Sequence, residues 1–151
     1  MMSLSKTFLV TMMSFVVSVT SVFSADAWLK SIPEALKLSE TEKKPIFVEF
    51  TGSDWCPPCI MMDKKVFSKK EFLEKAQEHY ILVKIDIPQG DKELSKKNEK
   101  VLDEYEVTGV PTVVLLDPQG KEFSRFSASQ FNTVEKMLGE LERQLRIKDM
   151  F

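Results

Sequence analysis

The sequence predicts one α/β domain in which a central mixed sheet carries helices on both faces. Segments of strand and helix character alternate along the chain, which indicates a sheet covered on both sides. The run Ile46–Phe50 is apolar except for Glu49, as is typical of a central strand. A turn motif at residues 117–120 predicts a β-hairpin, which would add an antiparallel strand at the edge of the sheet. The length of 151 residues, 43% of them hydrophobic, suits a single domain with a substantial core.

The first 27 residues are predicted to be a secretory signal peptide, followed by a domain over residues 28–151. Lys6 precedes an apolar stretch at residues 8–23, and Ala25 and Ala27 place small side chains where a signal peptidase cleaves. We expect cleavage near Ala27. The alternative is a retained membrane anchor. However, the stretch is diluted by Ser and Thr and is shorter than the roughly 20 apolar residues of a spanning helix.

The domain is predicted to open with a helix and then a buried strand. Trp28, Ile32 and Leu36 recur at helical spacing, which predicts a helix over residues 27–39. A polar connection then leads into the strand Ile46–Phe50. This strand delivers the following loop to the edge of the core.

That loop carries the two cysteines of the chain, Cys56 and Cys59, at C-x-x-C spacing. Pro57 and Pro58 suit the first turn of a helix, where the missing N–H groups would have no partner anyway. Cys56 would then lie at the helix N-terminus, where the dipole favours the reactive thiolate. A disulfide closing so small a loop would restrain the unfolded chain little, so we interpret the pair as redox-active rather than structural.

Two helices and a second strand follow. Apolar side chains at residues 60–66 predict a helix that continues from Cys56. Ser68 and Glu71 are spaced as a capping box, which predicts the start of another helix. The buried face of that helix comprises Phe72, Leu73, Ala76 and Tyr80. A β-strand is predicted at Ile81–Asp86.

The last third of the chain is predicted to contain a helix, a hairpin and a final helix. Pro118 and Gly120 fit a tight turn, because proline presets one dihedral and glycine accepts a positive φ. The predicted elements are a helix over 94–105, a turn at 107–111, a strand over 112–116, its returning strand over 121–126 and a helix over 131–145.

Charge and ligand content argue against two classes of partner. The formal net charge is −2, from 21 basic and 23 acidic residues without a long block of one sign, so no nucleic-acid partner is indicated. A closed zinc site usually needs four ligands, and two cysteines with the single histidine, His79, do not supply them. We expect no metal site and no cofactor, although copper(I) on the two thiolates is an alternative.

Two motifs together resemble the thioredoxin-fold family. Trp55 through Cys59 follows a strand, and Val107 through Thr112 contains a Gly-Val-Pro-Thr sequence that enters a strand at about the distance that the family shows. The resemblance extends from Trp28 to Ile147 and implies a thioredoxin fold. The sequence around Trp55 and the hairpin is similar to the exported bacterial branch, which includes periplasmic Dsb-type oxidoreductases. Periplasmic localisation is therefore expected.

The resemblance implies a role for each matching position. Cys56 would be the attacking thiol and Cys59 the buried resolving thiol. Glu49 lies where the family often keeps a buried carboxylate, which could accept the proton of Cys59 directly or through water; the alternative is a solvated or structural carboxylate. Pro111 would follow a cis peptide bond. The residues expected to contact substrate are Trp55, Pro57, Val110 and Pro111.

Two departures from the family affect the expected partner surface. The loop before Trp55 is about one residue longer than in cytoplasmic thioredoxin. Residues 127–129 read Ser-Ala-Ser where a glycine is common. Both put the shape of the substrate-contacting corner in question.

The dipeptide between the cysteines predicts the direction of electron flow. Pro-Pro lacks the histidine of strongly oxidising members, and its second proline matches thioredoxin, which favours a protein-disulfide reductase. Its substrates would be protein disulfides, and a membrane reductase is the expected electron donor. The alternatives are a disulfide oxidase or isomerase, or the copper carrier. An isomerase usually needs dimerisation or a second domain, and neither is indicated, so a monomer is expected.

Overall fold

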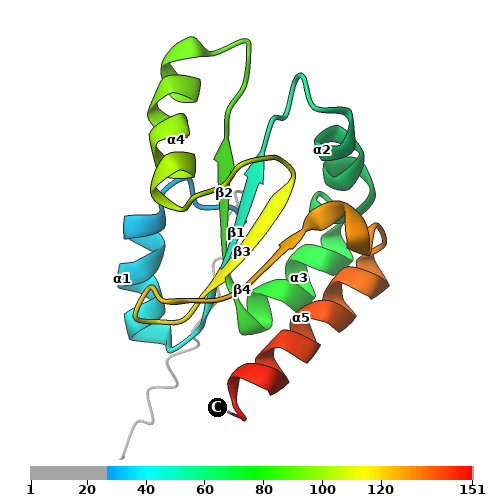
Figure 1. Ribbon diagram of the computed structural model, residues 1–151. Helices are drawn as coiled ribbons and strands as arrows, with labels where there is room; N and C mark the ends of the chain where they lie inside the picture. Colours follow the sequence, from blue (N-terminus) through cyan, green and yellow to red (C-terminus); the bar gives the residue numbers. More distant parts are fainter. Residues whose placement is uncertain (1–26, 151) are drawn as a thin grey trace, which may run out of the picture.

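The computed structural model describes residues 27–150, in which two layers of helices enclose a four-stranded sheet (Figure 1). The predicted signal peptide therefore lies outside the described residues, apart from Ala27. The strands are β1 (Ile46–Thr51), β2 (Ile81–Asp86), β3 (Thr112–Leu116) and β4 (Glu122–Ser127). The helices are α1 (Ile32–Glu42), α2 (Pro57–Met62), α3 (Lys70–His79), α4 (Lys92–Glu104) and α5 (Val134–Lys148), with a π-helical turn η1 (Asp63–Phe67) and a 3₁₀ turn η2 (Ala128–Phe131).

The sheet is mixed and has the strand order β2-β1-β3-β4. β1 is central: it pairs in parallel with β2 and antiparallel with β3. β3 and β4 form the predicted hairpin, in which Gly120 has a φ of 82°. The predicted thioredoxin fold, with a mixed sheet and helices on both faces, is confirmed.

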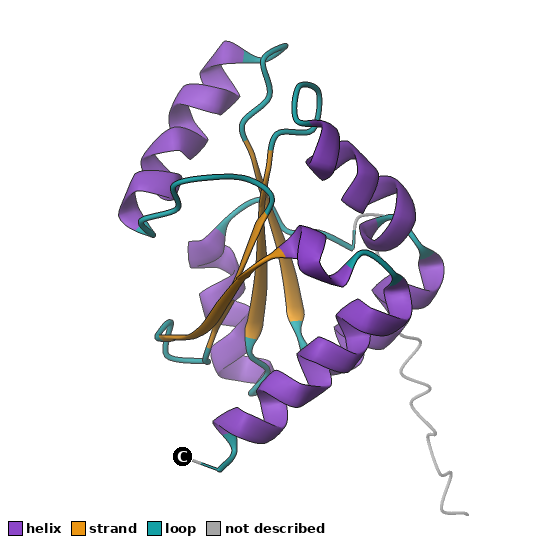
Figure 2. Ribbon diagram, turned by 45° about the vertical axis from the view of Figure 1, so that its right-hand side comes forward, coloured by secondary structure: helices purple, strands orange, loops and turns teal. Residues whose placement is uncertain are grey.

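Strand alternation divides the core between the two faces of the sheet, because successive side chains point to opposite sides. Phe47 on β1 faces the layer of α2, α3 and α5, whereas Val48 faces α1 and α4. Figures 1 and 2 show these two helical layers from different directions. Glu49 shares the face of Phe47, so its carboxylate points into the layer that begins with α2.

The first helix starts later than predicted. Residues 28–31 are not helical, and Leu29 forms a parallel bridge to Val83 at the edge of the sheet. The helix begins at Ile32, because the Ser31 hydroxyl accepts a hydrogen bond from the Glu34 amide and a proline fits the first turn. Trp28 is buried as expected, but it packs its ring against the core from extended backbone.

The predicted capping box at Ser68 is wrong. The Ser68 amide and hydroxyl both donate to the Asp63 carbonyl, which closes η1 instead of opening α3. α3 begins at Lys70 without a side-chain cap, and Glu71 pairs with Lys75 on the surface of the helix.

The last helix also starts later than predicted. Phe131 belongs to η2 and packs against Phe126 at 5.2 Å between ring centroids. α5 begins at Val134, because the Thr133 hydroxyl accepts a hydrogen bond from the Lys136 amide. Within residues 27–150, no helix has both the length and the apolar character that crossing a bilayer requires.

Candidate active site

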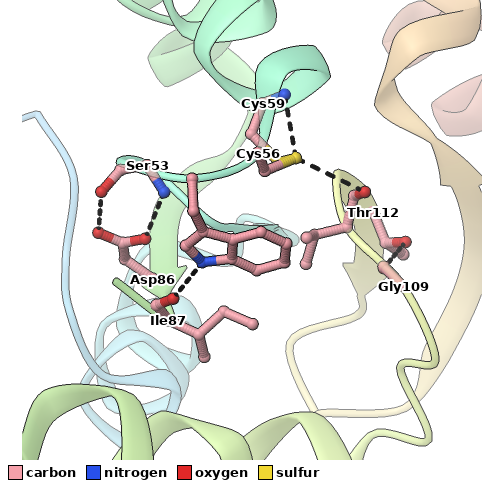
Figure 3. Close-up of a disulfide and its surroundings, with 9 residues drawn as sticks. Ser53, Cys56, Cys59, Asp86, Ile87, Gly109 and Thr112 are labelled. Atoms are coloured by element: carbon pink, nitrogen blue, oxygen red, sulfur yellow. Dashed lines mark hydrogen bonds between the residues drawn. A yellow bond between two sulfur atoms is a disulfide. The ribbon is translucent and has the colours of Figure 1, made fainter. Parts of the chain in front are cut away.

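The two cysteines form a disulfide at the start of α2 (Figure 3). Cys56 is the N-cap residue, and its sulfur accepts a hydrogen bond from the Cys59 amide at 3.3 Å. Pro57 and Pro58 occupy the first turn, as the sequence predicts. Cys59 is fully buried, whereas Cys56 retains 4% exposure, so an incoming group reaches the Cys56 sulfur first.

The loop before β3 lies directly against Cys56. The Cys56 Sγ is 3.9 Å from the Val110 carbonyl oxygen, and the peptide bond between Val110 and Pro111 is cis. The Thr112 hydroxyl donates to the Gly109 carbonyl at 2.7 Å, and the Ala128 amide donates to the Pro111 carbonyl at 3.1 Å. These bonds fix both ends of the loop, so the backbone of Val110 is held at the edge of the disulfide.

Trp55 forms a second wall beside the disulfide. Its side chain is 39% exposed, and the indole Nε1 donates to the Ile87 carbonyl at 2.7 Å. The ring lies so close to Gly52 that a β-carbon added at Gly52 would come within 2.5 Å of it. Glycine is therefore required at position 52 for Trp55 to keep this position. Ile60, 45% exposed on α2, adds an apolar side chain near the cysteines.

Glu49 is a fully buried carboxylate in the central strand. Neither of its oxygens makes a hydrogen bond to another group of the described chain. Burial raises its pKa to about 7, although the nearby Lys84 ammonium opposes this shift. A carboxyl group with such a pKa can exchange a proton at neutral pH. The alternative of a solvated carboxylate in an edge strand is excluded by the burial and by the strand order.

Lys84 links Glu49 to the surface near Cys59, although no sequence motif predicted a role for it. Lys84 is the register partner of Glu49 on β2, with Nζ 3.6 Å from one Glu49 oxygen and 2.8 Å from Asp63. Burial lowers the pKa of Lys84, but Glu49 and Asp63 outweigh it and raise the pKa overall. Lys84, Asp63 and Cys59 line one cleft of about 350 Å³. The sequence feature that could have indicated a role for Lys84 is its position as a single lysine within the apolar strand Ile81–Asp86.

The structure brings the predicted site residues together at the carboxyl end of β1. Cys56 and Cys59 form the disulfide, and four others lie around it: Trp55, Pro57, Val110 and Pro111. Glu49 lies deeper, at the level of Lys84. In the described part of the chain, no group of three or more His, Cys, Asp or Glu side chains is arranged to hold a metal ion.

A family model described as thioredoxin-like matches residues 27–118. The chain belongs to the thioredoxin-like family. Its predicted similarity to Dsb-type proteins is also confirmed. It is 37% identical over 107 residues to the disulfide bond reductase DsbH of Chlamydia pneumoniae, covering 69% of this chain and 64% of that relative. It is 27% identical to the thioredoxin-related protein DsbJ of the same organism, covering 67% of this chain and 30% of that relative.

Solved structures agree with the sequence comparison. A DsbH oxidoreductase superposes with a TM-score of 0.69 at 33% identity, covering 79% of this chain and 83% of that one. The chain spans less than two thirds of the length of the two curated relatives named above. The thioredoxin-like fold and Dsb-type kinship thus rest on both sequence and structure.

Proposed function

We propose that this protein is an exported thiol–disulfide oxidoreductase that reduces protein disulfides through Cys56 and Cys59. The observation that carries the proposal is the Cys56–Cys59 disulfide at a helix N-terminus, with the Cys56 sulfur beside the Val110 carbonyl. The similarity to a relative named disulfide bond reductase supports the reductive direction. The predicted export signal and the absence of other cysteines fit one redox pair working outside the cytoplasm.

The reaction would proceed in two exchange steps. The Cys56 thiolate of the reduced protein attacks one sulfur of a substrate disulfide, forms a mixed disulfide and releases the other sulfur as a thiolate. The Cys59 thiolate then attacks the Cys56 sulfur, which releases the second substrate thiolate and leaves the Cys56–Cys59 disulfide seen in the structure. Two electrons pass to the substrate in each cycle. A dithiol donor, proposed to be a membrane reductase, must return them.

The substrate would bind across the two walls of the site. An extended segment would lie along the Val110 backbone beside Pro111, while Trp55 and Pro57 contact the chain on the other side of Cys56. This assignment is supported by the exposure of Trp55 and Pro57 and by the contact of the Cys56 sulfur with the Val110 carbonyl.

Glu49 is proposed to accept the Cys59 proton during the second step. We expect Glu49→Gln to slow release of the mixed disulfide roughly tenfold at pH 7. This is less than the 10²–10⁴-fold typical of general acid–base catalysis, because water can replace the carboxylate in part. Rapid mixing of reduced protein with a disulfide substrate measures this rate. Unchanged release at neutral and alkaline pH would exclude the proton role.

The reduction potential tests the proposed direction. The purified full chain is equilibrated with glutathione buffers, with Cys59→Ser as the control that cannot form the internal disulfide. A value near that of thioredoxin, about −270 mV, is expected for a reductase, and insulin reduction by the thiol-fed protein should accompany it. A value near that of DsbA, about −120 mV, would instead indicate an oxidase.

A copper-binding carrier is the second candidate class, because two adjacent thiolates can hold copper(I). The disulfide seen in the structure must be reduced before the sulfurs become available. Titrating the reduced protein with copper(I) distinguishes the two functions. Tight stoichiometric binding without insulin reduction would favour the carrier.

A further inference from the structure

Two loops at the site are joined by hydrogen bonds that do not involve the cysteines. The Ile87 amide donates to the Thr51 carbonyl at 2.9 Å, and the Trp55 indole donates to the Ile87 carbonyl. The Ser53 amide and hydroxyl both donate to the Asp86 carboxylate. Figure 3 shows Ser53, Asp86 and Ile87 together on one side of the disulfide. The loop before Cys56 therefore depends on the loop after β2 for its position.

Asp54 contributes a further connection of a different kind. One oxygen of its carboxylate accepts the Gln89 amide and the other accepts the Gly90 amide, each at 2.8 Å. Gln89 and Gly90 are consecutive and exposed, and neither belongs to a helix or strand. These two amide bonds also lower the pKa of Asp54, so its carboxylate is ionised throughout the neutral range. A carboxylate that spans two successive amides holds the loop in one orientation.

Asp54 connects two residues that line one groove, Trp55 and Gln89. It precedes Trp55 in the chain, and it holds Gln89, which lines the same groove of about 620 Å³. The other lining residues are Ile87, Pro88, Lys92, Ser95, Lys96 and Glu99. A small disulfide reaching Cys56 has no need of this groove. A polypeptide carrying a disulfide extends beyond the sulfurs, and its flanking residues would meet the groove.

We propose that Asp54 is a positioning residue for protein substrates, which holds the Gln89–Gly90 loop and Trp55 in the arrangement that a polypeptide next to the target disulfide contacts. The inference rests on the proposed function and deepens it. It distinguishes two kinds of substrate for the same cysteines: disulfides within polypeptides, which would contact the groove, and small disulfides, which would not. The Asp54 carboxylate bonds to Gln89 and Gly90 and to neither cysteine. Its effect passes through Trp55 and Gln89.

Asp54→Asn tests the inference, because asparagine keeps one acceptor oxygen and replaces the other with a donor that cannot bond an amide N–H. Asp103→Asn is the matched control: Asp103 is exposed on α4, and its carboxylate makes no hydrogen bond or ion pair within residues 27–150. The full chains are compared for reduction of insulin and of glutathione disulfide, with dithiothreitol as electron source. Tryptophan emission is recorded for the reduced proteins.

We expect Asp54→Asn to lower kcat/KM for insulin about fivefold relative to kcat/KM for glutathione disulfide, mainly through KM. The emission maximum should move to longer wavelength as Trp55 loses its fixed position. Asp103→Asn should match the wild type in both measurements. Equal losses on the two substrates, or no loss on either, would overturn the inference while leaving the proposed function intact. A wild type inactive on both substrates would overturn the proposed function and this inference with it.

Discussion

Replacing Cys59 with serine is expected to arrest the protein at the mixed disulfide. Cys56 can still attack a substrate, but no second thiol is held within reach to release it. A group held in place acts at an effective concentration of up to 10⁵–10⁸ M, so its loss should reduce turnover at least about 10³-fold. Insulin reduction measures the loss, and non-reducing electrophoresis should show a covalent adduct with the substrate.

Cys56→Ser is the matched control, because it removes the sulfur that reaches the surface and keeps the buried one. Turnover of Cys56→Ser should fall as far as that of Cys59→Ser, but no covalent adduct with the substrate should accumulate. Cys59 is fully buried, with 0% exposure against 4% for Cys56, so a substrate does not reach its sulfur. Adduct formation by Cys56→Ser and not by Cys59→Ser would reverse the assigned order of attack.

Glu49 is expected to make the stability of the oxidised protein depend strongly on pH. Burial raises its pKa from 4.5 to about 7 in the folded protein. The folded state therefore binds a proton at Glu49 more tightly than the unfolded state does. The stabilisation from this protonation is present at pH 4 and is lost as the pH rises through 7. At 1.36 kcal/mol per pKa unit, the free energy of unfolding should fall by about 3 kcal/mol between pH 4.5 and pH 8.

Urea denaturation at several pH values measures this dependence. Glu49→Gln should flatten the curve, because glutamine does not titrate. Glu40→Gln, which changes an exposed carboxylate on α1, should keep the wild-type slope. Equal slopes for wild type and Glu49→Gln would show that the carboxylate is hydrated in solution, contrary to its burial in the structure.

Much of the site could be predicted from the chain alone because its parts are local in sequence. The two prolines after Cys56 suit the first turn of a helix, which places that cysteine at the N-cap. The apolar run around Glu49 indicates a buried central strand, and the burial of that carboxylate follows. The family resemblance supplied the expected roles of Val110 and Pro111, which are distant in sequence from the cysteines.

Predictions failed where one local pattern fits two structures. Trp28 lies at helical spacing from Ile32, yet an extended segment buries it equally well once β2 offers an edge to pair with. Ser68 and Glu71 have the spacing of a capping box, but the Ser68 hydroxyl bonds backward to the Asp63 carbonyl and ends a helix. In both segments, tertiary contacts determined which of the two local structures forms.

The sequence by itself determined the order of the elements, the α/β class and the redox pair, because periodicity, turn residues and C-x-x-C spacing act between near neighbours. Only the tertiary structure decided what surrounds the pair. Lys84 meets Glu49 because β2 pairs with β1 in one register, and Asp54 meets Gln89 because two loops converge at the carboxyl ends of those strands. Such contacts join residues some 35 positions apart, and no local pattern specifies them.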